Sequence, residues 1–263
     1  MVWLSGLLPY EYCQAVFERI GRVHIPSSSV WRQTQVHGEA LKTYVEHQQS
    51  LVSVERVVLP DAAQDHAQQK GISLDGGMVN IRGEGWKEFK VGVIFDVEQR
   101  LERDDRTGEL VERAHGVNMA YTAVLGAVEQ FAPALWAVAV THHVPHAADS
   151  SVSADGAEWI WNLVADYFPD SIQIIDWYHA AQHLASAAQA LFPQDDKQAQ
   201  TWFKARLEDL FQGHLAPIIK PLEQQGLSDE AHYFRVHQRR MHYQEFQEQG
   251  YPIGSGTVES GVK

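Results

Sequence analysis

The stretch Ile72-Ser-Leu-Asp-Gly-Gly-Met-Val79 alternates apolar and polar side chains on either side of an aspartate. Such alternation predicts a β-strand, and Phe89–Phe95 alternates in the same way, which predicts its hairpin partner. Residues 117–125 predict a third strand, and two short apolar segments, 151–154 and 172–175, each precede a helical pattern. Three antiparallel strands followed by two strand–helix units predict an α/β fold with a mixed five-stranded sheet.

Both flanks of this sheet are predicted to be helical. Residues 9–21 predict a short helix, and Ser27–Ser29 offer an N-cap for a second helix that begins near Val30. The pair fits a helix-turn-helix or an ordinary helical hairpin equally well. The charged stretch 98–113 predicts a solvated loop. We divide the chain into a helical segment at 1–60, a sheet core at 70–192, a helical block at 193–250 and the start of a final helix at 251–263.

Composition limits the class of protein. The chain has 263 residues, a net charge of −13 and a single cysteine, Cys13, so it cannot form an internal disulfide. No apolar run approaches the roughly 18 residues that a membrane-spanning helix needs. We therefore expect a cytoplasmic protein without a membrane partner.

The acidic balance argues against a strongly basic DNA-binding surface, because affinity for DNA comes largely from Lys and Arg on phosphates. Residues 111–200 carry ten acids against two bases, whereas residues 201–263 are nearly balanced at eight against seven. The candidate DNA contacts are few: Arg32 in the N-terminal helical segment, and Arg235, Arg239 and Arg240 in the helical block.

Three acidic residues far apart in the sequence are candidate metal ligands: Asp75, Asp155 and Glu259. Carboxylates that follow apolar segments, with a late glutamate on a helix, suit two Mg²⁺ ions about 4 Å apart in phosphoryl transfer. Each acid has an ordinary alternative: a turn aspartate for Asp75, the N-cap of a helix beginning at Glu158 for Asp155, and a first-turn helix acid for Glu259. Asp176, at the end of another strand, is a rival for the second ligand.

Four motifs in this order resemble one family of bacterial insertion-sequence transposases, the ISKra type of the Mutator-like DDE group: Trp86–Gly92, Asp155–Trp161, Asp176–Ala180 and Ile253–Ser260. The resemblance covers the chain from about residue 70 to its end. It implies a ribonuclease-H-like catalytic core with a helical insertion before the last catalytic helix. It also favours the helix-turn-helix interpretation of the N-terminal helices.

The resemblance further implies roles for individual residues. The three acids would bind two Mg²⁺ ions, with Mn²⁺ as an alternative, and Asp176 with His179 would form a supporting pair. If the motifs are misaligned, Asp176 replaces Asp155 as the ligand. In this family the last helix continues further, whereas here the sequence stops at Lys263, four residues after Glu259 (263 − 259). A truncated or decayed enzyme, or a fragment of a longer product, is therefore expected.

The resulting prediction is a DDE transposase that cleaves the ends of an insertion sequence and joins them to target DNA, acting as a homo-oligomer. Two other classes stay open. One is a ribonuclease-H-like nuclease that hydrolyses DNA without joining it, which a strand-transfer assay separates. The other is a non-catalytic DNA-binding or regulatory derivative of a transposase, which would bind DNA equally well without the three carboxylates.

Overall fold

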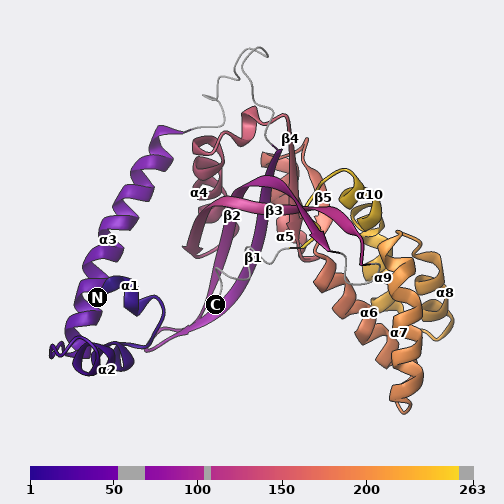
Figure 1. Ribbon diagram of the computed structural model, residues 1–263, viewed down its shortest axis with the longest axis horizontal. Coiled ribbons are helices and arrows are strands. Elements are labelled where there is room, and N and C mark those ends of the chain that lie inside the picture. The colour runs from indigo at the N-terminus through magenta and orange to yellow at the C-terminus, as the bar shows by residue number, and fades with distance from the viewer. Residues whose placement is uncertain (53–68, 104–107, 255–263) are drawn as a thin grey trace. The chain divides into compact units, whose positions relative to one another are not determined.

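The computed structural model describes residues 1–52, 69–103 and 108–254, and the chain divides into two compact units, Met1–Arg56 and Val57–Lys263 (Figure 1). Each unit is considered by itself. None of the described helices is both long enough and apolar enough to cross a membrane.

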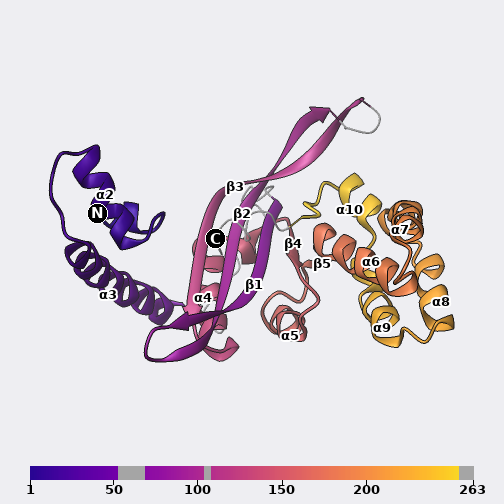
Figure 2. The ribbon, with the colours of Figure 1, turned by 90° about the horizontal axis from the view of Figure 1, so that it is seen from below.

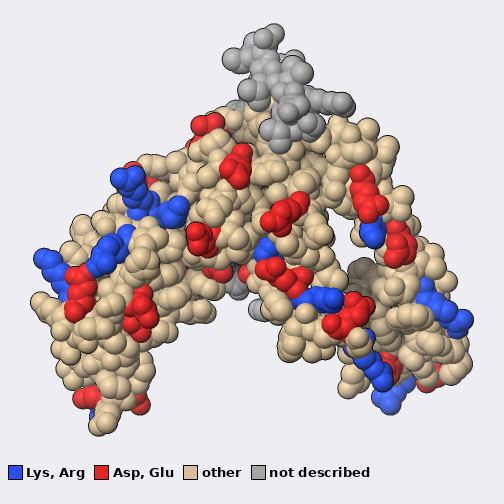
Figure 3. Space-filling model, turned by 180° about the vertical axis from the view of Figure 1, so that it is seen from behind, with Lys and Arg blue, Asp and Glu red and all other residues tan. Residues whose placement is uncertain are grey.

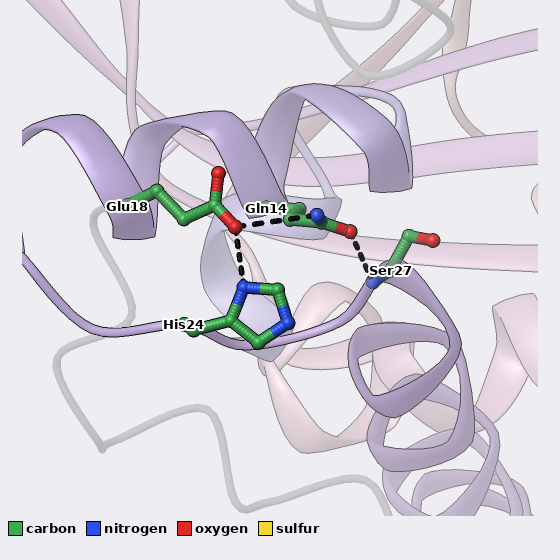
Figure 4. Close-up of polar contacts among 4 residues, drawn as sticks. All are labelled: Gln14, Glu18, His24 and Ser27. Atoms are coloured by element: carbon green, nitrogen blue, oxygen red, sulfur yellow. Dashed lines mark hydrogen bonds and ion pairs between the residues drawn. The ribbon is translucent and has the colours of Figure 1, made fainter.

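The described residues of the N-terminal unit, 1–52, form the helices α1 Val2–Ser5, α2 Tyr10–Arg19 and α3 Ser27–Leu51. The prediction that serines cap the second long helix is wrong, because α3 begins at Ser27 and its N-cap residue is Pro26. The Ser27 N–H instead donates to the Gln14 side chain at 2.9 Å, so α2 supplies the acceptor (Figure 4). Glu18 and His24 hold the connecting segment with a contact of 2.5 Å. Seven residues, 20–26, join α2 to α3, more than the three to four of a helix-turn-helix.

The second unit is built on a five-stranded sheet with the strand order β3-β2-β1-β4-β5. The β1–β2 and β2–β3 pairs are antiparallel, and the β1–β4 and β4–β5 pairs are parallel. The predicted α/β fold with a mixed five-stranded sheet is therefore confirmed. The strands are β1 Gln69–Ile81, β2 Gly85–Arg103, β3 Leu110–Leu125, β4 Asp149–Ala154 and β5 Ile172–Ile175.

β2 and β3 continue past the other strands as a two-stranded arm, which Figure 2 shows extending away from the sheet. The predicted loop at 98–113 is wrong over much of its length, because the ladder runs from Glu98 opposite His115 to Arg103 opposite Leu110. Residues 98–103 of the arm are polar or charged except for the exposed Leu101, so the alternation that marks a strand is missing there. Residues 104–107, which connect β2 and β3 in the sequence, lie outside the described part of the chain.

The main hydrophobic core lies between one face of the sheet and the helices that follow the strands. Helix α4 (Val128–Thr141) places Phe131 and Leu135 against β2, where a Cβ at Gly92 would lie 2.7 Å from Leu135. Helix α5 (Glu158–Tyr167) adds Ile160 and Val164, both fully buried. Each such side chain contributes about 1.5–3 kcal/mol when it leaves water. A short 3₁₀ turn, η2 (Val144–His146), joins α4 to β4.

The remaining helices form the helical block and its lead-in: α6 Trp177–Leu191, α7 Asp196–Phe211, α8 Ala216–Gln224, α9 Ser228–Val236, the 3₁₀ turn η3 Gln238–Arg240 and α10 Tyr243–Glu248. After α10 the chain returns to the sheet. The Trp177 N–H donates to the Ile253 carbonyl at 2.9 Å, and the Tyr251 hydroxyl donates to Asp149. The return segment is therefore held at β4 and at the junction of β5 with α6.

Candidate active site at the ends of three strands

The strand register brings three of the candidate acids to one edge of the sheet. Leu74 of β1 pairs with Ala154 of β4, and Ala154 pairs with Ile175 of β5. The next residue on each strand is an aspartate: Asp75, Asp155 and Asp176. Asp155 and Asp176 directly follow the last residues of β4 and β5, and Asp75 lies within β1 at the same level of the sheet. We use "acidic site" for these three residues.

Asp155 begins the loop that enters α5. Its Oδ1 accepts the Ala157 N–H at 2.8 Å, and Ala157 is the N-cap residue of the helix. Asp155 therefore stabilises the start of α5, but it lies two residues before the N-cap residue and is not itself the N-cap. The residue is half-buried, and no Lys or Arg among the described residues forms an ion pair with it.

Asp176 is fully buried and caps α6. Its Oδ1 accepts the His179 N–H at 2.8 Å, and its own N–H donates to the Ala154 carbonyl at 2.8 Å. This hydrogen bond between Asp176 and His179 is therefore donated by the main-chain N–H of His179 and not by its imidazole ring. The His179 ring lies 6.2 Å from the His183 ring, one turn further along α6.

Asp75 lies half-buried within β1, and its Oδ1 accepts the Gly76 N–H at 2.7 Å. Gly76 pairs with Lys90 of β2, and a Cβ at Gly76 would lie 3.3 Å from the Trp159 ring. The Lys90 ammonium is buried, lies 3.9 Å from the centre of the Trp159 ring and pairs with Glu88 at 2.7 Å. Sequence reasoning did not single out Lys90, although it belongs to the motif that carries the resemblance.

Three rings from α6 and α9, which sequence reasoning also missed, form a wall beside Asp155. The Tyr233 ring stacks on His183 with centroids 3.6 Å apart and planes 16° apart, and His237 lies 5.1 Å from Tyr233. Burial, and then Asp155 and Asp176, raise the pKa of Tyr233 above its usual value. The four-residue spacing of Tyr233 and His237 indicated a shared helical face, but that spacing is equally typical of core packing.

These three rings explain why a residue without a side chain, Gly156, follows Asp155. A Cβ at Gly156 would lie 2.8 Å from the Tyr233 ring and 2.9 Å from the His237 Nε2. We expect Gly156→Ala to lower the free energy of unfolding by about 1–3 kcal/mol, because α9 must move to admit the methyl group. Chemical denaturation measures the change.

Gly38→Ala is the matched control, since a Cβ at Gly38 within α3 meets no atom within 4 Å. This second substitution is expected to raise stability by about 0.5–1 kcal/mol through helix propensity. Equal effects of the two substitutions would contradict the close approach of α9 to Gly156.

His237 is predicted to make the stability of the folded chain pH-dependent. Burial first, then the charges of Arg240 and His183, lower the pKa of His237 to about 4, and Asp155 opposes the shift. Between about pH 4 and 6.5 the unfolded chain therefore binds more protons than the folded chain. This contribution to stability is complete above about pH 6.5 and is lost as the pH falls towards 4, by about 1–3 kcal/mol.

Denaturation at pH 4.5 and 7 compares the wild type with His237→Gln, which does not titrate in this range. The difference in stability between the two pH values should be smaller in the variant. Parallel pH profiles would show that His237 does not titrate abnormally.

The candidate DNA-binding arginines differ in their surroundings. Arg32 lies exposed on α3 of the N-terminal unit, and Arg239 is exposed in η3. Arg235 pairs with Glu223 of α8, and Arg240 lies 4.4 Å from the Trp161 ring and donates to Gln173 at 2.8 Å. On the face drawn in Figure 3, basic and acidic side chains of the described residues are interspersed. A role of these arginines in DNA binding stays a prediction.

Glu259 lies outside the described residues, which end at Gly254. A Cβ at Gly254 would lie 3.8 Å from the Asp176 Oδ2, so the chain returns to the acidic site five residues before Glu259 (259 − 254). Within the described ranges, no group of three or more His, Cys, Asp and Glu side chains is arranged to hold a metal ion. A complete ion site built on Asp75 and Asp155 would therefore need a further ligand.

A comparison of the chain with models of known protein families finds no match, and a comparison with curated proteins finds none either.

Proposed function

We propose that this chain is a DDE transposase with a ribonuclease-H-like core, which cleaves the ends of an insertion sequence and joins them to target DNA. The observation that carries the proposal is the register of β1, β4 and β5, which aligns Asp75, Asp155 and Asp176 at one sheet edge. Carboxylates from different strands at one edge can hold divalent cations against a phosphodiester.

The order of the strands supports the same conclusion. Three antiparallel strands with two parallel strands added beside β1 form the sheet that a ribonuclease-H-like core requires. The helical block follows α6 and returns at Gly254 beside Asp176. Five extended residues span at most about 18 Å, so Glu259 is within reach of the acidic site.

The donor set fits a hard divalent cation, because Mg²⁺ and Mn²⁺ prefer carboxylate oxygens. Asp75, Asp155 and Glu259 would hold the ions, which supply a Lewis acid for the phosphate and lower the pKa of the attacking water. Asp176 keeps the start of α6 in place next to Asp155, since it caps the helix and extends the parallel ladder. Lys90 and Trp159 pack beside Gly76, the residue that follows Asp75.

The proposal is tested with the purified full chain and a labelled duplex that carries the ends of its own element. We expect Mg²⁺-dependent nicks with free 3′-hydroxyl ends, joined products with target DNA, and no reaction with EDTA. Asp75→Asn should abolish both products while its amide oxygen still accepts the Gly76 N–H. Nicks without joined product would identify a nuclease, and DNA binding without cleavage in Mg²⁺ or Mn²⁺ would identify a non-catalytic derivative.

A further inference from the structure

Helix α3 is much longer than the helices that pack against it in the N-terminal unit. It has 25 residues and a length of about 37 Å, whereas α2 has 10 residues and a length of about 15 Å. Near its start Val30 is fully buried, and the Thr34 hydroxyl lies 2.9 Å from that of Ser5 in α1. None of residues 35–51 is buried, and Figure 1 shows α3 continuing past α1 and α2.

The side of α3 that packs at Val30 and Thr34 continues into this exposed half at intervals of three and four residues. Its members there are His37, Leu41, Tyr44, Gln48 and Leu51, which we call the α3 stripe. The side chains of Leu41, Tyr44 and Leu51 are 63, 60 and 59 % exposed. Alternating intervals of three and four residues form the heptad pattern with which two helices pair along their length.

The charged side chains of this half lie on the opposite side of the helix. Glu39, Lys42 and Glu46 are all more than about 100° around the helix axis from the centre of the α3 stripe. Lys42 and Glu46 form an exposed pair with each other at 4.0 Å. The stripe itself holds no Lys, Arg, Asp or Glu, so two copies of it can meet without like-charge repulsion and without burying a charge.

The exposed area of the stripe matches what a weak, specific dimer needs. Leu41, Tyr44 and Leu51 each expose an area on the order of 100 Å², and their neighbours bring the total to roughly 500 Å² per copy. Two copies would bury about 1,000 Å² in all, which is close to the lower limit for a specific interface. We therefore expect a dissociation constant in the micromolar range.

We propose that the α3 stripe is a dimer interface, and that its occupant is the α3 stripe of a second copy of this chain in antiparallel orientation. At Val30 and Thr34 the same side of α3 is already covered within its own unit. A parallel pair would bring both sets of α1 and α2 to one end of the dimer, whereas an antiparallel pair places them at opposite ends. Leu41 then lies opposite Leu51 of the partner subunit. The inference does not depend on the proposed function.

Sedimentation equilibrium of the full chain, at concentrations on either side of the micromolar range, tests the interface. Leu41→Lys and Leu51→Lys are each expected to raise the dissociation constant of the dimer at least about 100-fold, because each dimer would then bury two ammonium groups. Val36→Lys is the matched control. Val36 is 63 % exposed, like Leu41, but lies about 140° away from it around the helix, so this variant should dimerise like the wild type.

The outcomes decide the proposal in either direction. Loss of the dimer in the two stripe variants alone supports it, and circular dichroism confirms that their helical content is unchanged. A wild-type chain that stays monomeric at every concentration would overturn it, as would a dimer that both stripe variants retain. Two variants keep the test valid if one of them folds poorly.

Cross-linking with a short bismaleimide tests the orientation. Chains carrying Leu41→Cys mixed with chains carrying Leu51→Cys are expected to form a covalent dimer, whereas each variant alone should form little. The native Cys13 is fully buried and should not react. Efficient cross-linking of Leu41→Cys chains to each other would show a parallel pair and overturn the antiparallel arrangement.

Discussion

Asp155→Asn is expected to lower the rate of metal-dependent DNA cleavage by at least about a thousandfold, with almost no change in the free energy of unfolding. Loss of a cation ligand removes several kcal/mol of transition-state stabilisation, and about 4 kcal/mol corresponds to a thousandfold in rate. The fold should be preserved, because the Asn oxygen can still accept the Ala157 N–H that Asp155 accepts at 2.8 Å. Single-turnover cleavage and chemical denaturation measure the two quantities.

Asp176→Asn is the matched variant, because Asn caps helices about as well as Asp and can still accept the His179 N–H. We expect a smaller loss of cleavage from this change, since Asp176 acts through the position of α6. A larger loss from Asp176→Asn than from Asp155→Asn would exchange the two roles and make Asp176 the ligand. The comparison therefore decides the one ligand assignment that sequence motifs left open.

Asp96→Ala is expected to lower the free energy of unfolding by about 3–5 kcal/mol, because it leaves a buried ammonium without its partner. Lys70 is only 8 % exposed and forms an ion pair with Asp96, and Asn118 donates to Asp96 at 2.8 Å. Burial alone would raise the pKa of Asp96, but the hydrogen bonds from Lys70 and Asn118 outweigh it and lower the pKa. The carboxylate is thus ionised in the folded chain.

The pH dependence and the controls follow from the same contacts. Because the folded pKa of Asp96 is lowered, its contribution to stability is present above the ordinary pKa near 3.8 and is lost as the pH falls through the folded value. The double variant Lys70→Met, Asp96→Leu should recover most of the loss, since it leaves no buried charge. Glu223→Ala breaks the half-exposed pair with Arg235 and should cost less than about 1 kcal/mol. Equal losses from Asp96→Ala and Glu223→Ala would show that Lys70 is hydrated.

Local patterns predicted most elements of the sheet unit. The helix predicted to begin at Glu158 is α5, Glu158–Tyr167, and the strand predicted at 151–154 lies within β4. Prediction failed in the arm of β2 and β3, because its mostly polar residues 98–103 lack the alternation that marks a strand, although the backbone ladder pairs them. It also failed at Ser27, where a distant acceptor, Gln14, replaced the expected local cap.

The residues of the candidate site likewise fall into those that local patterns predicted and those that they did not. Asp75, Asp155 and Asp176 could be named from sequence because each directly follows a short, mostly apolar segment, and that signal is local. Tyr233 could not, because an aromatic residue in an amphipathic helix is most often part of a core. Its contact with Gly156, next to Asp155, is visible only in the structure.

The sequence by itself determined that Asp75 lies within a strand and that Asp155 and Asp176 each follow one, since side-chain alternation and helix starts depend on neighbouring residues. Only the tertiary structure decided that Leu74, Ala154 and Ile175 share one register, which aligns the aspartates that follow them. It also decided that α9 lies against Gly156. The physical reason is that strand register and helix docking are set by contacts between residues about 20 to 80 positions apart, which no local pattern encodes.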